Sequence, residues 1–151
     1  MKKKTVLIHS NFTRAFTGFG KNKKNIMRYL YDTGKYNLIE LANGIEWEAP
    51  STKLLPWTCR GSLPKPQEMQ GLTPEQKREQ GYGSKLVDRA IKEFKPDVYI
   101  GMEDIWAFNG YHTKPWWNKV NTMVWTTLDS LPILPQAIEY APKIKNYYVW
   151  A

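Results

Sequence analysis

The chain has 151 residues, 42% of them hydrophobic and 14% aromatic, and carries a formal net charge of +8. A single cysteine, Cys59, excludes an internal disulfide and is interpreted as a buried small hydrophobic residue in a reducing compartment. No run approaches the roughly 18 apolar residues of a membrane span, and the apolar run after the N-terminal lysines is too short for a signal peptide. We therefore expect one soluble, cytoplasmic, globular domain with a single core and no transmembrane segment.

The positive charge is concentrated near the N-terminus. Residues 1–35 hold nine Lys or Arg and one acid, Asp32, a net of +8, and the other 116 residues balance at thirteen charges of each sign. A concentrated positive potential attracts phosphates, nucleic acid or an acidic membrane surface. For the lysines at 2–4 the alternative is a frayed, solubilising tail.

A βαβ unit is predicted over the first forty or so residues. The short apolar run 5–9, "TVLIH", predicts a strand. Apolar residues at helical spacing follow over 26–31, with Asn22 as the expected N-cap and Gly34 just past the last turn. A second strand is predicted over 36–42, and the crossover implies that the two strands are parallel.

Residues 43–83 interrupt this pattern with five prolines and five glycines. Because these residues interrupt any regular period, we interpret the segment as a long surface insertion. Loops of this length in a compact domain are usually functional or mobile. Within the insertion, Thr73 followed by Pro74 predicts the start of a helix.

Regular elements resume after the insertion. A helix is predicted with Ser84 as its cap and Pro96 as its stop. The expected elements are a helix over 84–94, a strand over 97–101, an irregular segment over 102–117, a strand over 121–127, a short helix over 136–141 and a last strand over 145–151.

This alternation of strands and helices predicts an α/β fold, a Rossmann-like three-layer sandwich with a mostly parallel sheet. The chain stops at "YYVWA" without a helix to cover the last strand, whereas a doubly wound sheet needs helices on both faces. We therefore expect 1–151 to be one domain of a longer protein.

The first candidate site follows the first strand, at the end where open parallel sheets bind ligands. Gly18 and Gly20 let the backbone approach an anion, and the N-terminus of the following helix offers unpaired N–H groups. Lys21, Lys23 and Lys24 add positive charge. The alternative is that both glycines only permit a tight turn from strand to helix.

Two phosphate-binding fingerprints fit this loop poorly. A dinucleotide-binding sequence needs a third glycine or alanine where this chain has Lys23. Glu40 lies twenty residues after Gly20, the offset of a ribose-binding acid, but inside the predicted strand. The Gly-Lys-Ser/Thr ending of a P-loop is also absent. A nicotinamide-dependent oxidoreductase fragment is therefore disfavoured.

The second candidate site is the segment after the middle strand. It gathers carboxylates and aromatic rings, which suit a sugar, because sugar hydroxyls need acceptors and sugar C–H faces stack on rings. The alternative is a helix cap followed by ordinary core aromatics, and a lone histidine is more often structural than catalytic. The residues are Glu103, Asp104, Trp106, Phe108, Tyr111, His112, Trp116 and Trp117.

Asp129 is a third candidate, since it follows the strand predicted over 121–127, a place where side chains point into a cleft. The alternative is an aspartate that forms a turn.

Three segments together resemble the N-terminal, acceptor-side domain of GT-B glycosyltransferases, in particular the family-four type. They are "GFGKNKKNI", "KPDVYIGMEDIWAF" and "VWTTLDSLPILPQAIEYAPKIKNYYVWA". The resemblance covers the chain except for the insertion at about 43–83. It implies the N-terminal half of a GT-B fold, with the donor phosphates approached by Gly18, Phe19 and Gly20 and by the adjacent Lys21.

The resemblance also implies residues that act on the sugars. Asp104 and His112 are the positional candidates for catalysis, to which we add Asp129, and Glu103 and Trp106 are the candidates for binding the acceptor. Such enzymes bind most of the donor in a second, C-terminal domain, which these 151 residues do not include. They usually work without a bound metal, so we expect no metal and no cofactor.

The predicted function is therefore transfer of a sugar from a nucleotide-sugar donor to an unknown acceptor. Without its C-terminal partner domain the chain is expected to be inactive and prone to form a homodimer. The rival interpretation is a basic nucleic-acid-binding α/β module that uses the same charge and exposed aromatic rings.

Overall fold

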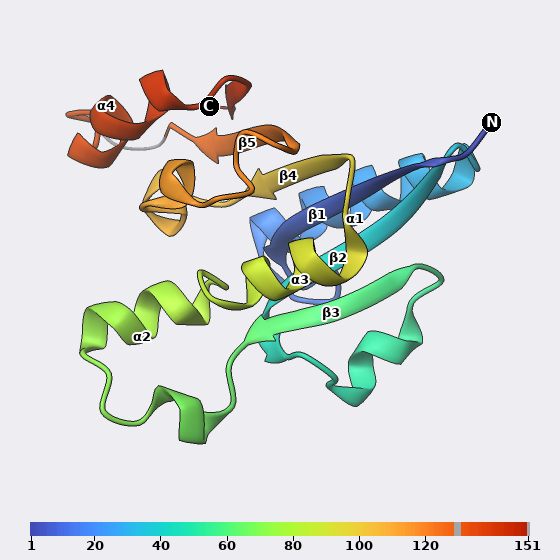
Figure 1. Ribbon diagram of the computed structural model, residues 1–151, viewed down its shortest axis with the longest axis horizontal. Helices are drawn as coiled ribbons and strands as arrows, with labels where there is room; N and C mark the ends of the chain where they lie inside the picture. Colours follow the sequence, from blue (N-terminus) through green and yellow to red (C-terminus); the bar gives the residue numbers. More distant parts are fainter. Residues whose placement is uncertain (129–130, 151) are drawn as a thin grey trace.

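A six-stranded, all-parallel sheet organises the fold. The structure is a computed structural model that describes residues 1–128 and 131–150. The strands lie in the order β3-β2-β1-β4-β5-β6 (Figure 1). They are β1 (Lys4–Asn11), β2 (Tyr36–Glu46), β3 (Thr58–Leu63), β4 (Val98–Met102), β5 (Asn121–Thr127) and β6 (Tyr147–Trp150).

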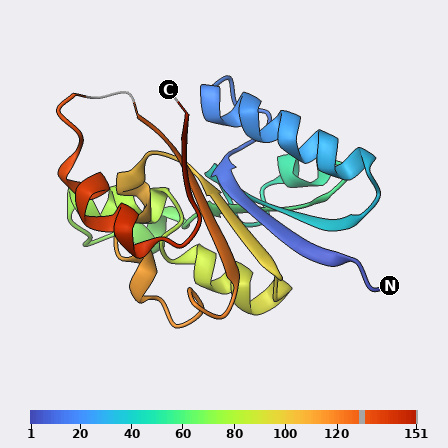
Figure 2. The same ribbon diagram turned by 90° about the horizontal axis from the view of Figure 1, so that it is seen from above.

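Helices cover both faces of this sheet. The longest, α1, lies on one face, and α3 and α4 lie on the other (Figure 2). Among the described residues, no helix has both the length and the apolar character to cross a membrane. The α-helices are α1 (Gly18–Asp32), α2 (Pro74–Gly81), α3 (Leu86–Phe94) and α4 (Pro135–Tyr140), and five short 3₁₀ segments are η1 (Pro50–Leu54), η2 (Pro66–Met69), η3 (Ile105–Phe108), η4 (Tyr111–Thr113) and η5 (Ala141–Lys143).

Strand β1 shows how the sequence builds the two cores. Its side chains alternate between faces, as in any strand. Leu7 packs toward α3 with Val87, whereas Val6 and Ile8 pack toward α1 with Met27. Because both faces are covered, the strand is apolar along most of its length, which is the pattern of a central parallel strand.

The predicted fold class is confirmed: the chain forms a Rossmann-like, three-layer α/β sandwich, and its first strand contains residues 5–9. The sheet order reverses between β1 and β4, which pair from Val6↔Val98 to His9↔Gly101. Connections leave these two strands toward opposite sides of the sheet. The carboxyl ends of β1 and β4, called the switch point below, are where such sheets bind ligands.

The prediction of a long surface insertion over 43–83 is wrong. Strand β2 continues to Glu46, and β3 pairs with it as a full member of the sheet. The sequence pattern did not predict β3, because its residues, "TCRGSL", include few large apolar side chains. Position 61 requires a glycine, because a Cβ atom there would clash with the backbone carbonyls of Ile45 and Glu46. The predicted start of a helix at Thr73 is confirmed by its capping bond from Gln76 N.

Two helix starts also differ from expectation. Thr17, not Asn22, caps α1, because its Oγ1 accepts a hydrogen bond from the backbone N–H of Gly20 at 3.0 Å. The helix therefore begins at Gly18, and the predicted glycine loop is its first turn. Ser84 does not cap α3, which begins at Leu86 without a side-chain cap.

A buried ion pair connects α1 to the sheet. Nζ of Lys23 lies 2.9 Å from Oε1 of Glu40 on β2, and both side chains are 0% exposed. The ammonium also donates to the carbonyl of Ser10 at 3.0 Å. Glu40 accepts further hydrogen bonds from the N–H and Oγ1 of Thr13 and from Nε1 of Trp57. The expected role of Lys23 as a ligand-facing charge is therefore wrong, and Glu40, which had the offset of a ribose-binding acid, is instead paired inside the protein.

We predict that Lys23→Met lowers the free energy of unfolding by about 3–5 kcal/mol, because it leaves the Glu40 carboxylate buried without its counter-ion. Arg28→Met is the matched control on the same helix. It breaks an exposed pair with Asp32 and should cost less than about 1 kcal/mol. Urea unfolding of both variants measures the difference, and equal small losses would contradict a stabilising role for the buried pair.

Candidate functional site

The N-terminus of α1 is one part of the switch point. The first intrahelical hydrogen bond runs from Lys21 N to the carbonyl of Thr17 at 3.0 Å. The amides of Gly18 and Phe19 precede this bond and point out of the helix end, and Gly18 and Lys21 are exposed. A helix end of this kind favours a bound anion, and the Lys21 ammonium adds a full positive charge.

The two glycines of this turn are present for different reasons. A Cβ atom at Gly20 would lie 2.8 Å from the carbonyl oxygens of both Phe12 and Ala15, so only glycine fits against the preceding loop. A Cβ atom at Gly18 would meet nothing within 4 Å. Gly20 therefore serves packing, as the structural alternative predicted, whereas packing does not require a glycine at position 18.

Aromatic rings lie between α1 and the ends of β5 and β6. The rings of Phe19 and Trp150 have centroids 5.8 Å apart, and those of Trp125 and Trp150 are 4.5 Å apart in an edge-to-face arrangement. Phe19 therefore packs on the outer strands rather than forming part of an open glycine loop.

Glu103 directly follows β4 and is 3% exposed. Its Oε1 accepts a hydrogen bond from Nδ2 of Asn43 at 3.0 Å. Burial raises the pKa of this carboxyl to about 7, although the Asn43 hydrogen bond and the positive charge of Lys23 oppose the rise. Glu103 can therefore gain or lose a proton near neutral pH, the property expected of a general acid or base.

A buried histidine lies next to this carboxylate system. Nδ1 of His9 is 2.8 Å from the hydroxyl of Tyr99, and Nε2 is 2.8 Å from Oδ1 of Asn43. Burial lowers the pKa of the imidazole to about 3, so the ring is neutral at physiological pH. The hydroxyl of Ser62 on β3 also donates to Oδ1 of Asn43.

Sequence reasoning missed this network. The signal was present, because polar residues stand near the carboxyl ends of otherwise buried strands: His9 on β1, Asn43 on β2 and Ser62 on β3. A polar side chain in a buried strand must find a partner. The sequence alone does not say that these three residues share one.

Asp104 lies between the ends of β4 and β5. It precedes η3 but its side chain makes no capping hydrogen bond there. Instead, Oδ1 of Asp104 accepts a hydrogen bond from Oγ1 of Thr127 at 2.8 Å. The side chain is half-buried, so this carboxylate is the more accessible of the two that follow β4.

Two other predicted site residues make their ring contacts with different elements. Trp106 packs against Tyr82 at 4.8 Å and against the guanidinium of Arg78 at 5.3 Å, on the α2 side. His112 stacks near Tyr140 of α4 at 5.6 Å. Phe108, Tyr111 and Trp117 belong to the core, as the structural alternative predicted. Asp129 lies outside the described residues.

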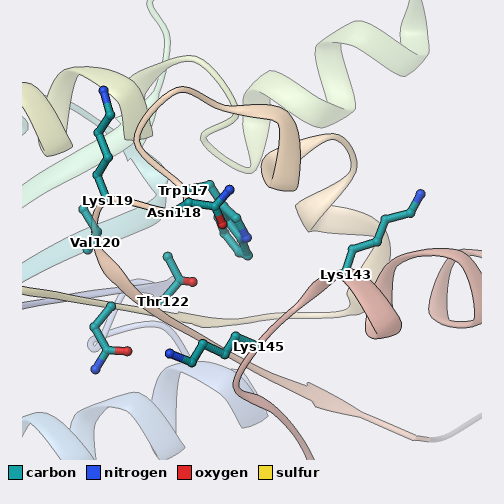
Figure 3. Close-up of a pocket in the computed structure, with 8 residues that line it drawn as sticks. Trp117, Asn118, Lys119, Val120, Thr122, Lys143 and Lys145 are labelled. Carbon is teal, nitrogen blue, oxygen red and sulfur yellow. The ribbon is translucent and has the colours of Figure 1, made fainter.

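A separate cavity of about 500 Å³ opens at the opposite edge of the sheet, where β5 begins (Figure 3). The side chains of Lys119 and Lys143 both extend away from Thr122 in Figure 3. Because the cavity lies at the amino ends of the strands, it is not at the position that open parallel sheets use for ligands. Its lining residues are Trp117, Asn118, Lys119, Val120, Asn121, Thr122, Lys143 and Lys145.

Comparison with known proteins finds no matching family model and no matching curated sequence. The function of the chain is therefore inferred from the geometry of the switch point and from the resemblance of three sequence segments to GT-B glycosyltransferases.

We predict opposite effects of alanine at the two glycines of α1. Gly20→Ala should lower the free energy of unfolding by about 1–3 kcal/mol, because the added methyl group overlaps the carbonyls of Phe12 and Ala15. Gly18→Ala should be neutral or stabilising by up to about 1 kcal/mol, since alanine favours the helix and the space is open. Thermal unfolding compares them, and a matching loss in both would refute the distinction.

We also predict a characteristic pH dependence for Glu103→Gln. Between pH 4.5 and 6.5, folded Glu103 holds a proton that the unfolded chain has lost, so its contribution to stability falls as pH rises. His9 behaves oppositely, because the unfolded chain holds the proton there. The two slopes, each about 1.4 kcal/mol per pH unit, cancel in the natural chain.

In Glu103→Gln only the His9 slope remains of this pair. The stability of the variant relative to the natural chain should therefore rise by about 2 kcal/mol between pH 4.5 and 6.5. Denaturant unfolding at several pH values measures this difference. Glu75→Gln, at an exposed position on α2, is the control for loss of a surface carboxyl. A flat difference for Glu103→Gln would show that its carboxyl is not perturbed.

Proposed function

We propose that the chain is the acceptor-side domain of a GT-B glycosyltransferase, which transfers a sugar from a nucleotide-sugar donor to an acceptor hydroxyl. One observation carries the proposal: the open N-terminus of α1 and the carboxylates of Glu103 and Asp104 belong to the same switch point of a 3-2-1-4-5-6 sheet. An anion-binding helix end beside carboxylates fits a reaction between a phosphate-bearing donor and a hydroxyl.

The helix end suits the leaving group. When the bond between the anomeric carbon and the diphosphate oxygen breaks, negative charge develops on that oxygen. The amides of Gly18 and Phe19 and the ammonium of Lys21 stabilise this charge. In GT-B enzymes a second domain holds most of the nucleotide, so the contribution of these groups to ground-state binding is small, at roughly 0.5–1.5 kcal/mol for each hydrogen bond.

The carboxylates suit the acceptor. The acceptor hydroxyl oxygen attacks the anomeric carbon, and its proton passes to a carboxylate. Asp104 takes this role in the proposal because it is the more exposed carboxylate and its second oxygen, Oδ2, is not the atom that Thr127 binds. Glu103, the buried neighbour of Asp104 in the sequence, can gain or lose a proton near neutral pH beside it. Trp106 and His112 remain candidates for contacts with the acceptor and the reacting sugar.

A nucleic-acid-binding module is the second candidate, and the exposed face of α1 favours it. Lys21, Lys24 and Arg28 are exposed there, together with Tyr29 and Tyr31. Cations interleaved with aromatic rings are typical of single-strand binding surfaces, whose affinity falls steeply with salt.

Backbone amide NMR of the ¹⁵N-labelled chain distinguishes the two candidates. Nucleotide sugars should perturb the amides of residues 18–21 with weak affinity. If single-stranded DNA instead binds tightly in a salt-dependent manner over residues 24–31, and nucleotide sugars perturb nothing, the glycosyltransferase proposal is wrong.

In the natural protein, we predict that Asp104→Asn lowers the rate of sugar transfer by about 10²–10⁴-fold, the usual contribution of a general base. Folding should be unchanged, because the amide oxygen can still accept from Thr127. Asp32→Asn, at an exposed position of α1 remote from the switch point, is the control and should keep full activity. Release of nucleoside diphosphate measures the rate, and full activity of Asp104→Asn would exclude this residue as the base.

A further inference from the structure

A continuous chain of buried hydrogen bonds ends at Glu103. It begins at the hydroxyl of Tyr99 on β4, passes through His9 on β1 and Asn43 on β2, and reaches Oε1 of Glu103. The three links measure 2.8, 2.8 and 3.0 Å. All four side chains are buried, so each of them needs a hydrogen-bond partner within the protein.

The direction of the chain follows from its last link. A carboxylate oxygen only accepts, so the Asn43 amide presents its NH₂ group to Glu103 and its oxygen to the other side. That oxygen accepts from the hydroxyl of Ser62 and from Nε2 of His9. Nε2 therefore carries the imidazole proton, and Nδ1 accepts from the hydroxyl of Tyr99.

When Glu103 is ionised, only one orientation of the Asn43 amide satisfies these partners. Turning it over would place its NH₂ group against the N–H of His9 and its oxygen against the Glu103 carboxylate. The alternative tautomer of His9 would leave the Asn43 oxygen facing a lone pair. Because burial keeps the imidazole neutral, with its pKa lowered to about 3, protonation does not disturb this order above acid pH.

We propose that Asn43 is a positioning residue which, held in one orientation by His9 and Ser62, fixes the Glu103 carboxylate at the switch point and stabilises its ionised form. The inference rests on the proposed function only for the use made of Glu103 in sugar transfer. The contact itself and its effect on the carboxylate are independent of the reaction.

The other groups around Glu103 do not replace Asn43. The backbone of Asn11 also hydrogen-bonds the carboxylate, but this contact is not part of the hydrogen-bonded chain that runs through His9. Lys23 attracts the charge from α1 but is paired with Glu40, and Asp104 repels it. Three phenols whose pKa is raised by burial remain uncharged at neutral pH: Tyr82, Tyr99 and Tyr111.

Two roles for Asn43 predict shifts of opposite sign in its Asn43→Ala variant. If Asn43 stabilises the ionised carboxylate, its loss raises the titration midpoint of Glu103, by about one to two pH units for a hydrogen bond to a charged group. If Asn43 only fills space, its loss admits water, which relieves the burial that raises the pKa and so lowers the midpoint.

The test is a ¹³C NMR titration of the Glu103 carboxyl carbon in the whole chain. Asn43→Ala should move the midpoint upward, and Asn37→Ala, at an exposed position of the same strand, should not. Ser62→Ala removes one donor that orients Asn43 and should move it upward by less. It provides the test if Asn43→Ala does not fold. An unchanged or lowered midpoint in the folded variant overturns the proposal.

A second readout follows the imidazole. The ¹⁵N shifts of His9 should report the tautomer protonated at Nε2 in the natural chain, and a ring protonated at Nδ1 would overturn the directed chain. Neither measurement uses a nucleotide sugar. An upward midpoint would therefore retain this inference even if the natural protein transferred no sugar, a result that would reject only the proposed function.

Discussion

The buried pair of Lys23 and Glu40 is the interaction on which the arrangement at the switch point depends. Two charges removed from water are tolerated only when nearly every donor and acceptor has a partner. Ser10, Thr13 and Trp57 supply those partners. The pair thereby ties α1, the loop after β1, and the segment before β3 to the middle of β2. The helix N-terminus is held over the sheet edge as a result of this internal pairing.

This pairing changes what the basic N-terminal third can offer to a ligand. Lys23 is used inside the protein, and the capacity of the first turn to face an anion comes from exposed Gly18, the free amides beside it and Lys21. Gly20 is also used internally, because it lets the loop carbonyls approach the helix. A short basic sequence with two glycines therefore divides into residues that build the turn and residues that remain open to a ligand.

Hydrophobic periodicity predicted the central strands, α1, α3 and the alternation that defines the fold class, because those elements bury large apolar side chains. It failed for β3, where the buried residues include Cys59, Gly61 and Ser62. This strand is held by backbone pairing with β2 and by the close approach of Gly61 to the β2 backbone. The role of Glu40 was equally hidden, since its partners at 13 and 57 meet it only after the sheet forms. Polar contacts between distant residues leave no local pattern in a sequence.

The two buried carboxylates, Glu40 and Glu103, illustrate why residue type alone did not define the site. Glu40 has a full positive counter-charge at 2.9 Å and three further donors, so its charge is compensated within the protein. Glu103 has neutral hydrogen-bond donors and a more distant ammonium that already has a partner. Burial therefore dominates at Glu103 and brings its pKa near neutrality. The same amino acid is structural on β2 and able to exchange a proton after β4, and the difference comes from where the single buried lysine points.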